Sequence, residues 1–264
     1  MKHFETIQAE FNGSVVTLWL ARPEVHNALD TIMIREILLF FTDLEEMQHI
    51  RMVIIRGKGL SFCSGADLRE MKNSISLDPK ENLKQSKELS DLFAAIFSSS
   101  KVVVAAVHGN VFGGGNGLVA AADLAYGTKE TRFALSETRV GMAAASITPY
   151  LMLKCPTSLL KELIFTARDF SGAEAAGYGL LNQTFDSSQS LELFLGGLIT
   201  NIQKNGQVAI SASKRLVNNL ALKRWSQEME QIPEILANIR ISPEAQEGFS
   251  AFLEKRKPKW TINQ

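Results

Sequence analysis

Apolar residues along the first two thirds of the chain alternate between nearly continuous runs and helical spacing. Residues 14–20, 52–56 and 102–107 form β-rich runs, and the last two are almost wholly apolar, which is typical of strands buried on both faces. Asp30 stands in the N-cap position ahead of helical spacing, and a second helical segment, 89–97, separates the second and third runs. This alternation of strands and helices predicts an α/β fold.

Shorter β-rich segments continue the pattern at residues 124–126, 133–135 and 181–185. The stretch 73–82 is polar and contains Pro79, so we expect a mobile loop there. Such a loop would be in a position to act as a lid.

From about residue 191 onward the strand signals vanish and helical spacing takes over. Helices are predicted over 191–203, 207–230 and 243–255. The last has Ser242 and Pro243 at its start, a favourable N-cap and first helical residue. We therefore divide the chain into a core, residues 1–190, and a C-terminal helical region, residues 191–264.

Composition narrows the class of protein. With 264 residues, 45% of them hydrophobic, the chain can bury a sizeable core without covalent staples. The 28 basic residues balance 28 acidic ones, which argues against a nucleic-acid partner. Cys63 and Cys155 stand alone, so we expect no metal site and no disulfide, and a reducing, cytoplasmic location. No apolar run approaches the ~18 residues of a membrane span, so no membrane partner is expected.

Two segments of small residues, 61–68 (Ser-Phe-Cys-Ser-Gly-Ala-Asp-Leu) and 109–117 (Gly-Asn-Val-Phe-Gly-Gly-Gly-Asn-Gly), follow apolar runs. Without bulky side chains, a ligand can approach the backbone amides. Two amides aimed at one oxygen would hold the negative charge of an enolate formed from a thioester. Either segment alone is more often a tight turn, but together they predict an oxyanion hole.

The order of these features resembles the crotonase superfamily, also called the enoyl-CoA hydratase/isomerase family. The resemblance covers nearly the whole chain and includes residues 22–23, 27–29, 136–141 and 252–256. It implies a spiral of repeated ββα units that acts on an acyl-CoA thioester, with coenzyme A as part of the substrate and no separate cofactor. It also implies a homotrimer or dimer of trimers, in which the C-terminal helices pack around neighbouring subunits.

Carried over residue by residue, the resemblance implies that the amides of Ala66 and Gly114 form the oxyanion hole and that Glu137 is the acid/base. Apolar surroundings would raise the pKa of Glu137 into its working range. The channel for CoA would be lined by Ser64, Gly65, Ala66, Asp67 and Leu68. Arg22 would meet CoA phosphates or remain a solvated charge, and Asp67 is also placed to cap a helix.

The chain departs from the family pattern at Gly117, where the resembled hydratases carry a second glutamate. A single carboxylate suits the 1,3-proton shift of a Δ3,Δ2-enoyl-CoA isomerase. However, residues 113–119, 135–141 and 146–150 look most like bacterial methylglutaconyl-CoA hydratases, in which a small residue at this position is tolerated. A glycine would leave room for a branched acyl chain or for a water held by Asn116, Ser136 or Ser146.

Three hypotheses follow, and the leading one is hydration of a branched 2-enoyl-CoA such as 3-methylglutaconyl-CoA, in leucine or acyl-CoA catabolism. The alternatives are the isomerase and a non-catalytic acyl-CoA-binding protein. A second carboxylate on the substrate would require a cation if buried, and the candidates are Arg139, Lys154 and Arg168. Phe249, Phe252 and Trp260 are candidate subunit-interface anchors or part of an intramolecular cover.

Overall fold

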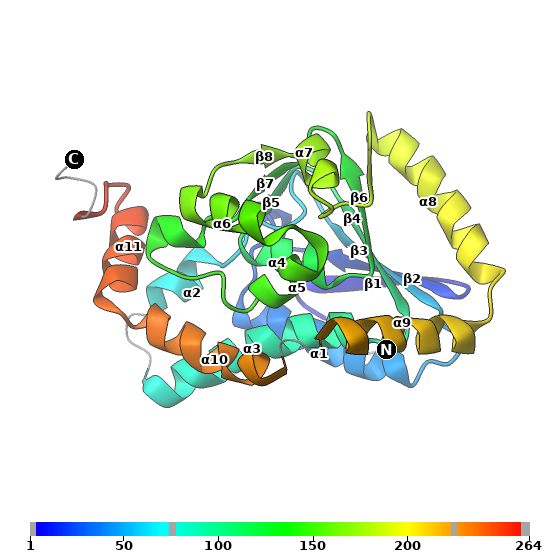
Figure 1. The fold of residues 1–264 in the computed structure, drawn as a ribbon, viewed down its shortest axis with the longest axis horizontal. Helices are drawn as coiled ribbons and strands as arrows, with labels where there is room; N and C mark the ends of the chain where they lie inside the picture. Colours follow the sequence, from blue (N-terminus) through cyan, green and yellow to red (C-terminus); the bar gives the residue numbers. More distant parts are fainter. Residues whose placement is uncertain (1–3, 74–77, 223–225, 260–264) are drawn as a thin grey trace.

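The strands of the protein form two sheets (Figure 1), and the computed structural model describes residues 4–73, 78–222 and 226–259. The larger sheet has the order β1-β2-β3-β4-β6-β9 and the smaller one the order β5-β7-β8. The pairs β1·β2 and β7·β8 are antiparallel and the others parallel. The strands are β1 (Ile7–Asn12), β2 (Val15–Leu20), β3 (Met52–Gly57), β4 (Val102–Val107), β5 (Asn110–Phe112), β6 (Leu124–Thr128), β7 (Arg132–Ala134), β8 (Phe170–Ser171) and β9 (Gln183–Phe185).

Helices cover these sheets and end the chain. They are η1 (Pro23–Val25), α1 (Thr31–Glu45), α2 (Leu68–Asn73), α3 (Pro79–Ser98), α4 (Gly114–Ala121), η3 (Glu137–Val140), α5 (Thr148–Lys154), α6 (Thr157–Thr166), α7 (Gly172–Gly177), α8 (Ser188–Gln203), α9 (Gln207–Leu222), α10 (Ser226–Arg240) and α11 (Pro243–Leu253). The mixed architecture confirms the predicted α/β class.

The central strands are apolar throughout because both faces of the larger sheet are covered. On β4, Val103 and Ala105 face the main core, whereas Val102 and Val104 face a second cluster that includes Leu191 on α8. Figure 1 shows α8 running alongside the sheet and α4 near the middle of the molecule. All residues of α4 after the first are buried. A glycine-rich helix start is thereby fixed deep inside the fold, beside the sheet.

One prediction for the first 82 residues is confirmed and another is partly wrong. The helix after Asp30 is confirmed, because the Asp30 side chain accepts a hydrogen bond from the Met33 amide (2.8 Å). The loop expected over 73–82 is wrong from Pro79 onward, since α3 begins there and Asp78 caps it through the Lys80 amide (2.8 Å). Proline is favoured at the first position of a helix, so Pro79 starts a helix. Residues 74–77 lie outside the described part of the chain.

β1 is a strand that the apolar pattern of the sequence does not predict. Its burial alternates from Ile7 onward, since it is an edge strand with one face toward solvent. Such a strand carries polar residues at every second position, and the weak apolar signal hides it.

The C-terminal region is helical as predicted, but α10 and α11 fold back over their own chain. α10 packs against α3, and α11 packs against η3 and α2 (Figure 1). Phe249 is buried in this contact and Phe252 is half exposed, so Phe249 belongs to an intramolecular cover and is not a free interface anchor. Trp260 lies outside the described residues. The trimeric assembly stays a prediction.

The helix boundaries in this region differ from one expectation. The segment predicted as a single helix over 207–230 is two helices, α9 and α10. α11 is as predicted, with the Ser242 hydroxyl accepting from the Ala245 amide (3.2 Å).

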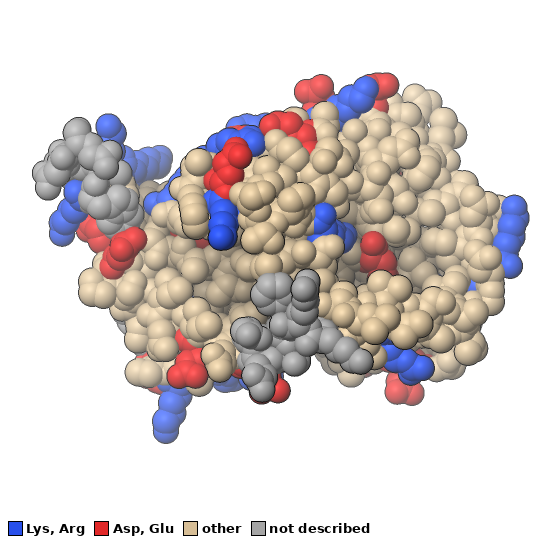
Figure 2. Space-filling model, viewed as in Figure 1, with Lys and Arg blue, Asp and Glu red and all other residues tan. Residues whose placement is uncertain are grey.

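Neither sign of charge dominates the surface in view. Figure 2 shows acidic and basic side chains interspersed on this face, without a single-sign field. Cys63 and Cys155 are both buried and free. Among the described residues, no helix is long and apolar enough to cross a membrane. The same part of the chain holds no group of three or more metal-ligating side chains placed to hold an ion.

Candidate active site

The two small-residue turns touch each other. Cys63 donates its amide hydrogen bond to the Asn110 carbonyl (3.1 Å) and accepts one from the Phe112 amide (2.9 Å). Gly65 has a φ of +93° and Gly113 a φ of +47°. A Cβ on Gly65 would lie 3.1 Å from the Phe112 carbonyl oxygen, and one on Gly113 would lie 3.6 Å from the Gly65 Cα. Glycines at both positions therefore allow the turns to approach backbone to backbone.

The amides of Ala66 and Gly114 are both free at this junction. Leu29 pairs with the residues on either side of Ala66, donating to the Gly65 carbonyl (2.7 Å) and accepting from the Asp67 amide (3.0 Å), so the Ala66 N–H points away from it. Gly114 is the first residue of α4, where an amide has no acceptor within the helix. Neither amide donates a backbone hydrogen bond to another described residue.

Both residues line one cavity of about 830 Å³. The first turn, α2, α3 and the segment 142–147 form much of its wall. The C-terminal helices complete the wall through Leu236, Arg240, Phe249 and Phe252. The sequence indicated Phe249 and Phe252 only as interface or cover residues and did not indicate Leu236 or Arg240, because all four reach the cavity through the packing of α10 and α11 on the core.

Glu137 lies at the same junction, as the first residue of η3 directly after β7. A Cβ on Gly113 would lie 3.6 Å from its Oε1. Its Oε2 is buried and has no hydrogen-bond partner among the described residues. Burial disfavours the charged form and raises the pKa of Glu137 to about 7. Both protonation states are then populated at neutral pH, as an acid/base catalyst requires.

Gly117 does not open space, contrary to expectation. It is buried in α4, and a Cβ there would lie 2.4 Å from Ile147 Cγ2 and 2.5 Å from Phe93 Cε1. These side chains occupy the volume expected for a branched acyl chain or a water. Gly117 is also not part of the cavity wall. The glycine is required by packing of α4 against α3 and the segment before α5.

Of the two other residues predicted to line the substrate pocket, Ser146 lines the cavity and Asn116 does not. Asn116 is buried away from the cavity, and its Nδ2 donates to the Val111, Gly113 and Ala134 carbonyls (3.2, 3.3 and 2.9 Å). It therefore tethers the start of α4 to the strands and is not placed to hold a water in the cavity. Ser146 does line the cavity, and its hydroxyl is hydrogen-bonded to that of Ser90 (3.0 Å).

The expected CoA-contacting residues also divide into two groups. The cavity wall includes Ser64, Gly65, Ala66, Asp67 and Leu68. Arg22 is absent from it, and its guanidinium pairs with Asp30 (3.0 Å) and Asp67 (2.8 Å). It also donates to the Ala28 carbonyl (2.8 Å). Two carboxylates thus neutralise Arg22, and its ion pair with Asp67 stabilises the first turn. The expected contact between Arg22 and the CoA phosphates is therefore not supported, because Arg22 is paired and lies outside the cavity wall. Asp67 also accepts from the Arg69 amide (2.8 Å), the expected capping bond.

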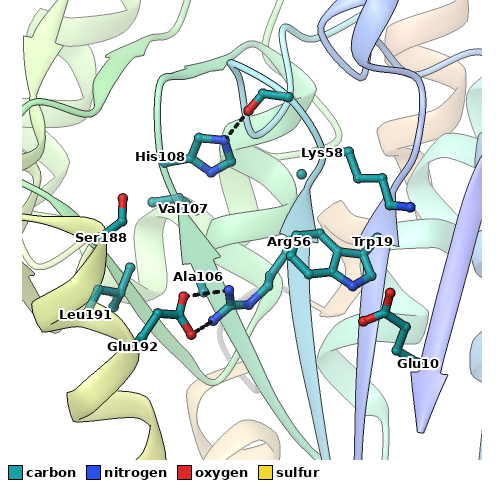
Figure 3. Close-up of a pocket in the computed structure, with 12 residues that line it drawn as sticks. Glu10, Trp19, Arg56, Lys58, Ala106, Val107, His108, Ser188, Leu191 and Glu192 are labelled. Carbon is teal, nitrogen blue, oxygen red and sulfur yellow. Dashed lines mark hydrogen bonds and ion pairs between the residues drawn. The ribbon is translucent and has the colours of Figure 1, made fainter.

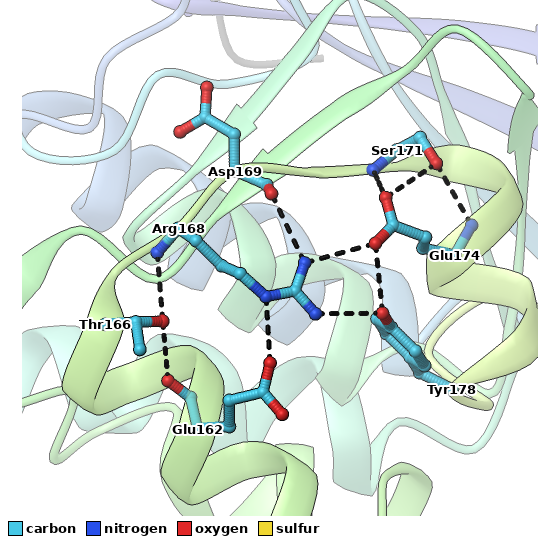
Figure 4. Close-up of polar contacts among 7 residues, drawn as sticks. All are labelled: Glu162, Thr166, Arg168, Asp169, Ser171, Glu174 and Tyr178. Atoms are coloured by element: carbon cyan, nitrogen blue, oxygen red, sulfur yellow. Dashed lines mark hydrogen bonds and ion pairs between the residues drawn. The ribbon is translucent and has the colours of Figure 1, made fainter.

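None of the three cations expected to meet a distal carboxylate is available for it. Lys154 is buried outside the cavity wall and donates to the Val119 carbonyl (3.0 Å), and burial lowers its pKa to about 8. Arg168 is enclosed by Glu162, Glu174 and Tyr178 (Figure 4). Arg139 lines the cavity but pairs with Asp169 (3.2 Å).

A second cavity, of about 530 Å³, lies apart from these residues and contains none of the predicted catalytic groups (Figure 3). Its arginine, Arg56, makes two hydrogen bonds to Glu192 (2.6 and 2.8 Å) and lies 5.5 Å from the centre of the Trp19 ring. His108 is hydrogen-bonded to the Gly59 carbonyl (2.9 Å), so this histidine stabilises a turn.

The packing around Gly117 leads to a stability prediction. We expect Gly117→Ala to lower the free energy of unfolding by about 1–3 kcal/mol, because Phe93 and Ile147 would have to move. The matched control is Gly196→Ala on the exposed side of α8, where no atom lies within 4 Å; it should raise the free energy by about 0.5–1 kcal/mol. Urea unfolding of both variants measures the difference. A Gly117→Ala protein as stable as the parent would contradict the tight packing.

The chain is similar to known proteins over nearly its full length. Residues 10–263 match the family described as Enoyl-CoA hydratase/isomerase. The crystal structure of an enoyl-CoA hydratase from Mycobacterium avium is similar with a TM-score of 0.85 and 30% identity, covering 97% of this chain and 98% of that one.

Two curated relatives carry different reaction names. A Thermus thermophilus protein described provisionally as an enoyl-CoA hydratase is 32% identical over 256 residues, covering 96% of this chain and 100% of its own. The mitochondrial Δ(3,5)-Δ(2,4)-dienoyl-CoA isomerase of Rattus norvegicus is 29% identical over 277 residues, covering 96% of this chain and 84% of its own. The chain therefore belongs to the enoyl-CoA hydratase/isomerase family of enzymes, and its fold is crotonase-like.

Proposed function

We propose that this protein is a hydratase-type lyase that adds water to a branched 2-enoyl-CoA, such as 3-methylglutaconyl-CoA. The observation that carries the proposal is the Glu137 carboxylate, whose buried Oε2 has no partner among the described residues, beside the free amides of Ala66 and Gly114 on the wall of one cavity. Coenzyme A enters as part of the substrate, along the turn that contains Ser64 and Leu68.

In this proposal the thioester carbonyl oxygen accepts hydrogen bonds from both amides. When a water oxygen adds to C3, electron density moves to that carbonyl oxygen and an enolate forms. Preorganised donors at that position lower the barrier, and one donor of this kind typically contributes about 100- to 1000-fold in rate. The amide at Gly114 adds the positive end of the α4 dipole.

Glu137 balances the protons of the reaction by itself. Its ionised form takes a proton from the water as the C3–O bond forms, and its protonated form then delivers that proton to C2. The carboxylate returns to its starting state, and the product has gained one water. A pKa of about 7 serves both steps. Ser136 and Ser146, which line the cavity, supply hydroxyls that would hold the water.

A second reaction is favoured by the packing at Gly117. Phe93 and Ile147 fill the space next to the backbone position at which a second carboxylate is expected in hydratases. A single carboxylate is sufficient for a Δ3,Δ2-enoyl-CoA isomerase, in which Glu137 would remove a proton from C2 of a 3-enoyl-CoA and return it at C4. The same amides would hold the enolate, so the two reactions differ only in whether water adds.

Product mass separates these reactions. The purified protein is incubated with 3-methylglutaconyl-CoA, crotonyl-CoA and 3-hexenoyl-CoA, and products are followed by liquid chromatography and mass spectrometry. We expect a gain of one water, fastest with 3-methylglutaconyl-CoA. Conversion of 3-hexenoyl-CoA alone, at constant mass, would establish the isomerase instead. No conversion of any substrate would refute both reactions and favour an acyl-CoA-binding protein.

A further inference from the structure

Arg240 is a half-buried, largely desolvated cation on the wall of the active-site cavity. It is the last residue of α10 and lines the same cavity as Glu137. Its guanidinium donates to Asn82 Oδ1 (3.1 Å), a neutral acceptor. No carboxylate of the described residues forms an ion pair with it. A partly desolvated charge without a counter-ion in contact costs free energy, and a bound anion would offset that cost.

The guanidinium is held in place before any ligand arrives. Asn82 is buried on the first turn of α3, and its Nδ2 donates to the Ala237 carbonyl on α10 (2.7 Å). This bond leaves the Asn82 Oδ1 directed at Arg240. The Arg240 carbonyl in turn accepts from Gln246 Nε2 (2.7 Å). One neutral hydrogen bond uses a single donor of the five on a guanidinium, so most of the fork is available to a bidentate acceptor.

The nearby acidic group does not neutralise this charge by contact. Glu70 lines the cavity and interacts with Arg240 through space, where it partly offsets the lowering of the Arg240 pKa by burial. Its Oε1 accepts a long hydrogen bond from the Thr31 amide (3.4 Å).

The other arginines on the wall differ from Arg240. Arg139 is paired with Asp169, and Arg69 is exposed to solvent. Arg240 therefore differs from both: it is half buried where they are exposed, and it lies on the cavity wall without an ion pair to any described residue. Its neighbours on that wall include Leu236 and Phe249, both buried and apolar. Apolar side chains and a fixed guanidinium on the same wall fit a short acyl chain with an acid group at its far end.

We propose that Arg240 binds a carboxylate at the distal end of the acyl chain, so that the enzyme selects dicarboxylic acyl-CoA substrates over neutral ones of the same length. This inference rests on the proposed acyl-CoA function and assigns its specificity to a residue of the C-terminal helices. It places the anion in the acyl pocket and not among the phosphates of CoA.

Binding of unreactive ligands tests the inference without requiring turnover. Calorimetry compares glutaryl-CoA, butyryl-CoA and free CoA on the wild-type protein and on Arg240→Met. We expect the wild type to bind glutaryl-CoA at least about 10-fold more tightly than butyryl-CoA. Removing one partner of a buried charge pair should weaken glutaryl-CoA binding by roughly 100-fold in Arg240→Met, with butyryl-CoA and free CoA changed by less than about 3-fold.

Two further variants control for structure. Arg240→Lys keeps the charge and should retain part of the preference, although it loses the bidentate geometry. Arg69→Met removes an exposed arginine from the same wall and should leave the preference intact.

Equal binding of glutaryl-CoA and butyryl-CoA to the wild type would overturn the inference, whether or not any variant folds. An equal loss for all three ligands in Arg240→Met would also overturn it, by assigning Arg240 to CoA phosphates or to folding. The turnover assay is read separately. A preference for glutaryl-CoA without hydration would refute the proposed reaction alone, and hydration without that preference would refute the role of Arg240 alone.

Discussion

Glu137→Gln should lower turnover by about 100- to 10,000-fold while acyl-CoA binding changes by only a few-fold. The substitution keeps the size and shape of a side chain beside Gly113 but removes its ability to exchange a proton. Steady-state rates with the best substrate, together with calorimetry of a saturated acyl-CoA, measure the two effects. Retained turnover in the variant would show that another group moves the proton.

The stability of Glu137→Gln relative to the wild type serves as the folding control, and it should depend on pH. The folded-state pKa of Glu137 is about 7, above its ordinary value of 4.5, because burial disfavours the carboxylate. The stability associated with the neutral form is fully present below about pH 4.5 and is lost as pH rises through about 7. Glutamine stays neutral, so Glu137→Gln should be more stable than the wild type at pH 8, by about 1–3 kcal/mol. Thermal unfolding from pH 5 to 8 measures this; a less stable variant at pH 8 would mean that the loss of activity reflects misfolding.

Removing one amide of the proposed oxyanion hole should have the next largest effect. Ala66→Pro deletes the N–H that faces the cavity and breaks no hydrogen bond between backbone groups, because that amide has no acceptor among the described residues. We expect kcat to fall by about 100- to 1000-fold. Ala66→Ser is the matched control, since it keeps the amide at this accessible position, and its kcat should stay within about 3-fold of the wild type.

The two variants at position 66 are compared after their unfolding midpoints are shown to be similar. If Ala66→Pro folds and turns over substrate as fast as Ala66→Ser, the amide does not stabilise the enolate. Retained binding of a saturated acyl-CoA would further place the loss in the chemical step, because the hydrogen bond from the amide to the carbonyl oxygen is stronger in the transition state than in the bound substrate.

Local chemistry explains which elements the sequence predicted well. Asp30 and Ser242 mark helix starts because each offers a side-chain oxygen to the amide three residues later. The runs at β3 and β4 are apolar because the larger sheet is covered on both faces. The segment 73–82 was misjudged because proline starts a helix as readily as it breaks one, and only the packing of α3 decides between them.

The candidate site was predictable where its function depends on the backbone. Gly65 and Gly113 indicate a close approach of two turns, since only glycine adopts their backbone conformations without strain. The raised pKa of Glu137 was expected from apolar surroundings and is found. By contrast, the packing of Gly117 against Phe93 and Ile147 could not be predicted from the sequence. A glycine is compatible both with an open pocket and with a crowded core.

Residue types at short range and the order of the motifs were sufficient to predict the family, the α/β class and the two turns that carry the proposed oxyanion hole. Which charges are free depends on how the chain folds. Arg22 is neutralised by two aspartates, Arg168 by two glutamates, and Arg240 is left facing the cavity. Charged side chains look alike in a sequence, and their roles depend on partners that folding brings together from distant segments.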